Sequence, residues 1–113
     1  EKRLHRQMEL AAHFRGRVAE DPELTLSFEP EWINVCFEVT GKPSDKICYL
    51  LDKRQLAKLG WGIVFGRRVI RMVCVNPALT EADMDELLAN VKLVARELPE
   101  ADNAIDNRQA SDD

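Results

Sequence analysis

The strand-like segment at residues 69–75 contains one chemically distinctive residue. It reads Val-Ile-Arg-Met-Val-Cys-Val, and Arg71 is its only charge. Apolar residues fill both alternating sets of positions, which is typical of a strand covered on both faces. A guanidinium keeps its proton in proteins, so burial of Arg71 demands an anionic partner. Its planar fork of parallel N–H donors matches a carboxylate.

Two interpretations of Arg71 follow from this pattern. In the first, Arg71 pairs with a Glu or Asp of the same chain, or lies near a strand end and reaches water. In the second, Arg71 presents its fork to the carboxylate of a ligand. Composition and periodicity do not separate the two.

The remaining residues offer little catalytic chemistry. Neither GxGxxG nor GxxxxGK[ST] occurs, so no glycine-rich phosphate loop is expected. The serines lack a His and an Asp in an ordered constellation, and the lysines lie on polar helix faces or in a turn. Cys36, Cys48 and Cys74 form no CxxC pair and are expected to be buried thiols of a cytoplasmic protein. His5 and His13 share one predicted helix, so we expect neither a metal site nor a catalytic residue in this chain.

Charge and hydropathy limit the classes of partner. The net charge is -4, and the acidic excess lies in residues 99–113, which leaves residues 1–98 close to neutral. A neutral body argues against nucleic-acid binding, which needs a basic surface. No apolar run approaches the roughly 18 residues that a membrane span requires. The charged N-terminus does not resemble a secretory signal, and the start at Glu1 suggests a fragment or a processed product.

Periodicity and turn residues predict the elements that must position Arg71. The predicted elements are a helix at 2–19, strands at 24–28 and 33–39, a helix at 44–59 capped by Ser44 and ended by Gly60, a hairpin at 61–75 with its turn at 66–68, and a helix after the N-cap Thr80 that reaches Leu98. Short connections favour antiparallel pairing. The sequence therefore predicts an α+β domain at residues 1–98, with a small antiparallel sheet of about four strands and helices packed on one face. Residues 99–113 are predicted to be an acidic, disordered tail.

Two segments resemble a known enzyme family. Residues 28–37 read Phe-Glu-Pro-Glu-Trp-Ile-Asn-Val-Cys-Phe, and residues 69–80 contain Arg-Met-Val-Cys-Val-Asn-Pro and continue into Asp-Met-Asp at 83–85. In this order and spacing they are similar to the C-terminal domain of the group II pyridoxal-phosphate-dependent amino-acid decarboxylases. That group includes the glutamate, cysteine sulfinate, diaminobutyrate, aspartate and aromatic-amino-acid decarboxylases. The turn at 66–68 is more basic, and the linker at 41–44 shorter, than in many members.

The resemblance implies the C-terminal domain of the type I aminotransferase-like fold. It implies that the partners of this fragment are the N-terminal domain and the large domain of the same chain, and that the large domain holds pyridoxal phosphate. It also implies that the full-length enzyme is a homodimer, and that no cofactor binds this fragment, which should be inactive alone. Arg71 matches the arginine that holds the carboxylate of the amino-acid substrate. The first alternative is an autonomous small α+β module that binds a ligand or a protein. The second alternative is an RNA-binding sheet, which is disfavoured because no strand face carries a pair of aromatic residues.

Overall fold

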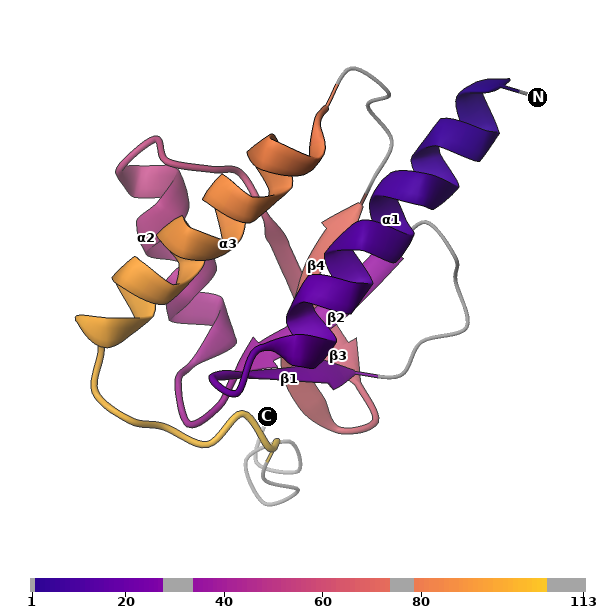
Figure 1. Cartoon of the computed structure of the whole chain (residues 1–113). Helices are drawn as coiled ribbons and strands as arrows, with labels where there is room; N and C mark the ends of the chain where they lie inside the picture. The colour runs from indigo at the N-terminus through magenta and orange to yellow at the C-terminus, as the bar shows by residue number, and fades with distance from the viewer. Residues whose placement is uncertain (1, 28–33, 74–78, 106–113) are drawn as a thin grey trace.

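The computed structural model describes residues 2–27, 34–73 and 79–105 (Figure 1). The described elements, in chain order, are α1 (Lys2–Glu20), β1 (Leu24–Ser27), β2 (Asn34–Val39), α2 (Ser44–Lys53), β3 (Gly60–Val64), β4 (Arg67–Val73) and α3 (Glu81–Arg96). This order matches the predicted sequence of helices and strands. The segments at 28–33 and 74–78, with Cys74, lie outside the described residues.

The four strands form one antiparallel sheet in the order β1-β2-β4-β3. The predicted α+β class with a small antiparallel sheet is therefore confirmed. β4 lies inside the sheet, where Val35 of β2 stands opposite Met72, and Cys36 opposite Arg71. On its other side, β4 pairs with β3, which brings Gly60 opposite Arg71.

The hydrophobic core lies between one face of the sheet and the three helices (Figure 1). Alternate residues of the strands, such as Phe37 and Ile70, are fully buried against the helices. The rings of Phe14 in α1 and Phe37 in β2 meet edge to face, with their centroids 5.5 Å apart. The apolar stripe of α1 differs from the predicted one in its first half, because Leu10 is buried and Met8 is 37% exposed.

The prediction for α2 was wrong at both ends. Ser44 is the first helical residue rather than the cap: its backbone N–H donates to Oδ1 of Asn103 at 2.9 Å, and its hydroxyl donates to the carbonyl of Arg68 at 2.9 Å. The helix ends at Lys53 because Gln55 adopts a left-handed conformation with φ 58°. The N–H of Leu56 then reaches back to the carbonyl of Leu51, as in a Schellman motif.

The β3–β4 hairpin turns one residue earlier than predicted. Phe65 and Gly66 both have positive φ, 51° and 74°, as a tight two-residue turn of type I′ requires. Arg67 and Arg68 are consequently strand residues rather than turn residues. This shift places Arg67 on the same face of β4 as Arg71.

The predicted start of α3 is confirmed. Thr80 is its N-cap, and the side chains of Thr80 and Asp83 each accept the other residue's backbone N–H, which forms a capping box. Met84, Leu88 and Val91 are buried on the inner stripe of this helix.

The expectation of an unpacked tail does not hold for residues 99–105. The N–H of Ala101 donates to the carbonyl of Gly41, and the N–H of Ile105 donates to the carbonyl of Gly66. Ala104 forms an antiparallel bridge with Arg67. This segment, residues 99–105, therefore packs beside the start of β4; we call it the C-terminal strap. Residues 106–113 lie outside the described residues.

Candidate functional site

The two faces of β4 carry different chemistry. Ile70 and Met72 are buried in the core among the helices. Val69 is also buried, with 1% exposure, but it does not belong to that core cluster, and neither does Cys36 of β2. Strand alternation places these two residues on the opposite side of the sheet. We call this side the arginine face; its residues are Cys36, Glu38, Arg67, Val69 and Arg71.

Arg71 lies in the middle of the arginine face. Its side chain is half-buried, and its Nε atom is fully buried. The guanidinium extends over β3: a Cβ built on Gly62 would lie 3.5 Å from Nη2 and 3.7 Å from Cζ of Arg71. Arg71, the only charge of residues 69–75 in the sequence, is thus a half-buried residue of an inner strand whose guanidinium lies over Gly62 of β3.

A second arginine on this face is engaged with a buried carboxylate. Glu38 is only 5% exposed, and its two oxygens accept hydrogen bonds from Nε and Nη2 of Arg67 at 2.7 and 3.0 Å. This bidentate contact is the geometry in which guanidinium and carboxylate match best. The hydrogen bond to Glu38, followed by its charge, raises the pKa of Arg67 above its ordinary value. Asp102 lies 3.5 Å from the same guanidinium.

Asn103 of the C-terminal strap completes this cluster. Its side chain is 2% exposed. Nδ2 donates to Glu38 at 3.1 Å and to the carbonyl of Lys42 at 2.7 Å, while Oδ1 accepts the N–H of Ser44. Its own carbonyl accepts the N–H of Arg68 at 2.8 Å. The side chain and backbone of Asn103 together therefore join β2, β4 and the start of α2. Both N–H groups and the oxygen of its side-chain amide have partners.

Glu38, Arg67 and Asn103 are not among the site residues predicted from the sequence. A signal existed for Glu38, because it is a lone anion in the apolar segment Val-Cys-Phe-Glu-Val, just as Arg71 is a lone cation in its strand. The sequence pattern predicts a turn at Arg67 and a disordered tail at Asn103. Their contacts join residues 29 and 65 positions from Glu38, which local patterns do not reveal.

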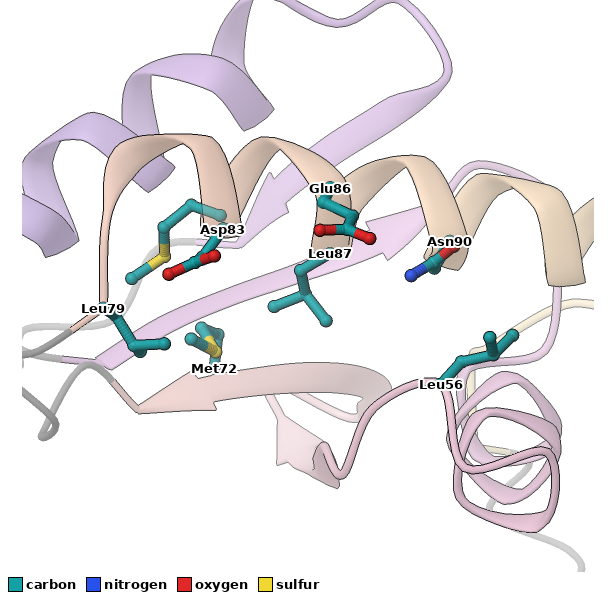
Figure 2. Close-up of a pocket in the computed structure, with 8 residues that line it drawn as sticks. Leu56, Met72, Leu79, Asp83, Glu86, Leu87 and Asn90 are labelled. Carbon is teal, nitrogen blue, oxygen red and sulfur yellow. The ribbon is translucent and has the colours of Figure 1, made fainter.

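A separate pocket lies on the helix-covered side. It has a volume of about 400 Å³ and is lined by Leu56, Met72, Leu79, Asp83, Met84, Glu86, Leu87 and Asn90. Figure 2 shows side chains of α3 along one wall, with Leu79 and Leu56 at opposite ends. Met72 and Arg71 are neighbours on β4 that point to opposite sides, so this pocket does not include Arg71.

The described cysteines and acidic residues show no arrangement for a metal. Cys36 and Cys48 are both buried, and burial raises the pKa of the Cys48 thiol to about 12. His13 contacts Asp85 at 3.1 Å, and Arg17 contacts the same carboxylate at 3.3 Å. His5 contacts Glu9 at 3.2 Å. Within residues 2–27, 34–73 and 79–105, no group of three or more potential metal ligands gathers. None of the helices in this part of the chain has the length and apolar character needed to cross a membrane.

The comparisons with known proteins agree on the fold. No protein-family model and no curated protein sequence matches the chain. Among solved structures, mouse CSAD in its apo form superimposes with a TM-score of 0.75 and 25% identity, over 87% of this chain and 24% of that chain. Oryza sativa TDC with PLP gives a TM-score of 0.72 and 17% identity, over 85% of this chain and 23% of that chain.

A third structure is the glutamate decarboxylase domain of a diaminobutyrate-pyruvate transaminase and L-2,4-diaminobutyrate decarboxylase from Vibrio parahaemolyticus. It gives a TM-score of 0.66 and 23% identity, over 80% of this chain and 22% of that chain. The chain thus spans about a quarter of the length of the structures that it matches. These likenesses confirm the resemblance that two sequence segments indicate, namely to one part of the group II pyridoxal-phosphate-dependent amino-acid decarboxylases.

Proposed function

We propose that this chain is the C-terminal domain of a pyridoxal-phosphate-dependent L-amino-acid decarboxylase, in which Arg71 binds the substrate carboxylate and the domain closes the active site. One observation carries the proposal: a partly buried guanidinium lies on the sheet face opposite the three helices, in the strand whose Arg-Met-Val sequence resembles the family. Parallel N–H donors of Arg71 would fix the carboxylate in one orientation, which is catalysis by positioning.

The cofactor belongs elsewhere in this proposal, because the described lysines do not suit a Schiff base. Lys42 donates to the carbonyl of Leu98 at 2.7 Å, and Lys92 pairs with Asp21 at 2.6 Å. Lys46, Lys53 and Lys58 are exposed. The large domain of the same polypeptide would hold pyridoxal phosphate, which supplies the electron sink for decarboxylation. The proposal includes a homodimeric, cytoplasmic full-length enzyme and an inactive isolated fragment.

Substitution of Arg71 in the full-length enzyme tests the role of the guanidinium. Arg71→Ala should raise KM and lower kcat/KM by about 100-fold, because a charge-assisted bidentate contact is lost. Bound cofactor, measured by absorbance, should be unchanged. Arg68→Ala is the matched control, since Arg68 is a half-buried arginine of the same strand on the other face. Steady-state constants equal to those of the parent would contradict the proposal.

The pocket between α3 and the segment before β3 favours a second candidate, an autonomous ligand-binding module. Mixing the 113-residue chain with pyridoxal phosphate, followed by borohydride reduction, tests whether this domain itself binds the cofactor. The decarboxylase proposal expects no stoichiometric adduct at one specific lysine. Peptide mass mapping that locates such an adduct would contradict the assignment of the cofactor to another domain.

A further inference from the structure

The pocket on the helix-covered side has an apolar floor. Met72 of β4 and Met84 of α3 line it, and both belong to the hydrophobic core, with 7% and 1% exposure. Leu79 and Leu87 are half-buried, and Leu56 is 39% exposed, so the apolar lining continues from the core toward solvent. A molecule in this pocket would therefore bury apolar surface, which is favourable in water.

The ends of two helices set the length of the pocket. Leu79 directly precedes Thr80, the N-cap of α3. At the other end, Gln55 has φ 58°, and the N–H of Leu56 returns to a carbonyl of α2 at 2.9 Å. Figure 2 shows Leu87 of α3 between these two ends. The volume of about 400 Å³ lies in the range of small-molecule sites, which is roughly 300–1,000 Å³. The pocket is therefore of a size for a small molecule.

The wall that α3 contributes is acidic. Asp83, Glu86 and Asn90 line the pocket at helix positions i, i+3 and i+7, so they share one face of α3. Figure 2 shows their carboxylate and amide groups in a row along the helix. Oδ2 of Asp83 accepts the N–H of Thr80 at 2.9 Å, which fixes the orientation of that carboxylate. The lining residues include no Lys, Arg or His, so none of them balances these two charges.

Basic residues near α3 pair with other acidic groups. Arg54 makes a bidentate contact with Glu97, with N···O distances of 2.6 and 2.8 Å. Lys92 donates to Asp21 at 2.6 Å, and Arg17 contacts Asp85 on the side of α1. Within the part of the chain that the structure describes, neither carboxylate of the pocket has a basic partner. The negative charge of the wall is therefore left for a ligand.

This lining favours a cation with an apolar body. An ammonium group carries several N–H donors and no acceptor, and the wall supplies carboxylate oxygens and the amide oxygen of Asn90. A ligand carboxylate would meet two like charges at Asp83 and Glu86, which disfavours it. A primary amine should consequently bind better than the amino acid with the same side chain, because the amino acid adds a carboxylate beside its ammonium group.

We propose that this pocket binds a small primary amine. The ammonium group lies at Asp83 and Glu86, and the aromatic or aliphatic body packs on Leu56, Leu87 and Met72. The site lies on the side of the sheet opposite the arginine face. It requires nothing of the residues on that face, so it stands whether or not the proposed function is correct.

The proposed decarboxylation would produce a ligand of this class. Decarboxylation replaces the carboxylate of a zwitterionic amino acid by a proton and releases carbon dioxide, which leaves a primary amine that is cationic at neutral pH. The pocket therefore distinguishes the product of such a reaction from its substrate. This connection to the product rests on the proposed function, whereas the preference for an amine rests on the lining of the pocket.

Titration of the ¹⁵N-labelled 113-residue chain with phenethylamine tests the site. The backbone amide signals of Leu56, Leu87 and Asn90 should shift with one common Kd. Phenylalanine and 3-phenylpropanoate have the same ring with an added or a substituted carboxylate, and both should bind at least about tenfold more weakly. Equal affinity for the three compounds, the absence of a saturable shift, or shifts confined to residues outside the pocket would each overturn the proposal.

Removal of the two charges tests the acidic wall. Asp83→Asn/Glu86→Gln should weaken phenethylamine binding about tenfold, at about threefold for each exposed carboxylate, while Asn can still accept the N–H of Thr80. Glu20→Gln removes one charge at an exposed position of α1 and is the control with unchanged Kd. Glu86→Gln alone, outside the capping box, keeps the test decisive if the double variant does not fold. A Kd equal to that of the parent would reject the proposal.

Truncation of one end of the pocket tests the apolar contact. Leu56→Ala should raise the Kd for phenethylamine about threefold, because less apolar surface is buried against the ring. Leu93→Ala, at an exposed leucine of α3 that does not line the pocket, is the matched control. An unchanged Kd in Leu56→Ala would contradict the placement of the ring. The two proposals fail separately, because Arg71→Ala reports on substrate binding and these titrations report on the pocket.

Discussion

The two faces of the sheet are built from the same strands but are stabilised by different interactions. On the helix-covered face, side chains such as Phe37 and Ile70 are fully buried and touch apolar residues of the three helices. On the arginine face, the burial of Glu38 depends on hydrogen bonds from Arg67 and Asn103. Apolar contacts are individually weak and tolerant of direction, whereas a buried ion pair needs every partner in place. One face therefore supplies most of the stability, and the other supplies directed polar groups.

The largest expected effect breaks the helix-covered face. Phe37→Ala should lower the free energy of unfolding by about 4 kcal/mol, because it removes a fully buried ring and its edge-to-face contact with Phe14. Urea denaturation followed by circular dichroism measures this loss. Leu93→Ala, at a side chain that is 49% exposed, is the control and should change stability by less than about 1 kcal/mol. Similar losses for both variants would show that the core does not lie where the structure places it.

A second, smaller effect should come from the polar cluster of the arginine face. Asn103→Ala should cost about 2 kcal/mol, because the N–H of Ser44 and the carboxylate of Glu38 each lose a buried partner. Asn103→Asp should cost more than Ala, since it places a second carboxylate against Glu38. Asn90→Ala, at a half-buried asparagine of α3, is the comparison variant. Equal stability of Asn103→Ala and the parent would mean that the contacts of Asn103 do not stabilise the fold.

The sequence was sufficient to predict those helix boundaries that depend on residues close together in the chain. The capping box of Thr80 and Asp83 lies within four residues, and the stripe of α3 repeats at the helical period. The end of α2 was missed because the left-handed residue is Gln55, where pattern rules expect glycine. Its start was missed because the side chain that accepts the N–H of Ser44 lies 59 residues away.

In the candidate site, too, local features could be predicted from the sequence and long-range contacts could not. Arg71 was accessible to pattern reasoning, because a single charge in an apolar strand is visible without any knowledge of pairing. The partnership of Glu38 with Arg67 was not, since it depends on which residues of β2 and β4 face each other. Register arises from the packing of the whole sheet, and a shift of one residue would have moved both side chains to the helix-covered face.

The smallest expected effect concerns a charged pair at the rim of the helix-covered side. Lys92 of α3 donates to Asp21, just after α1, at 2.6 Å, and this hydrogen bond lowers the pKa of Asp21 below its ordinary value of 3.8. A carboxyl group whose pKa is lower in the folded state stabilises the fold above its unfolded pKa and loses that contribution as the pH falls through its folded pKa. Because both side chains are partly exposed, Asp21→Asn should cost less than about 1 kcal/mol near neutral pH.

The pH dependence of stability would show how much the Asp21–Lys92 ion pair contributes to the free energy of unfolding, compared with the buried core. The stability difference between the parent and Asp21→Asn should be constant above pH 3.8 and shrink as the pH falls below it. Urea unfolding at a series of pH values measures this difference, with Glu20→Gln at the exposed neighbouring position as the control. A difference that grew on acidification would have the opposite sign and would mean that Asp21 binds its proton more tightly in the folded chain. A loss much smaller than those at Phe37 and Asn103 is expected, because water screens Asp21 and Lys92 while it is excluded from the other two sites.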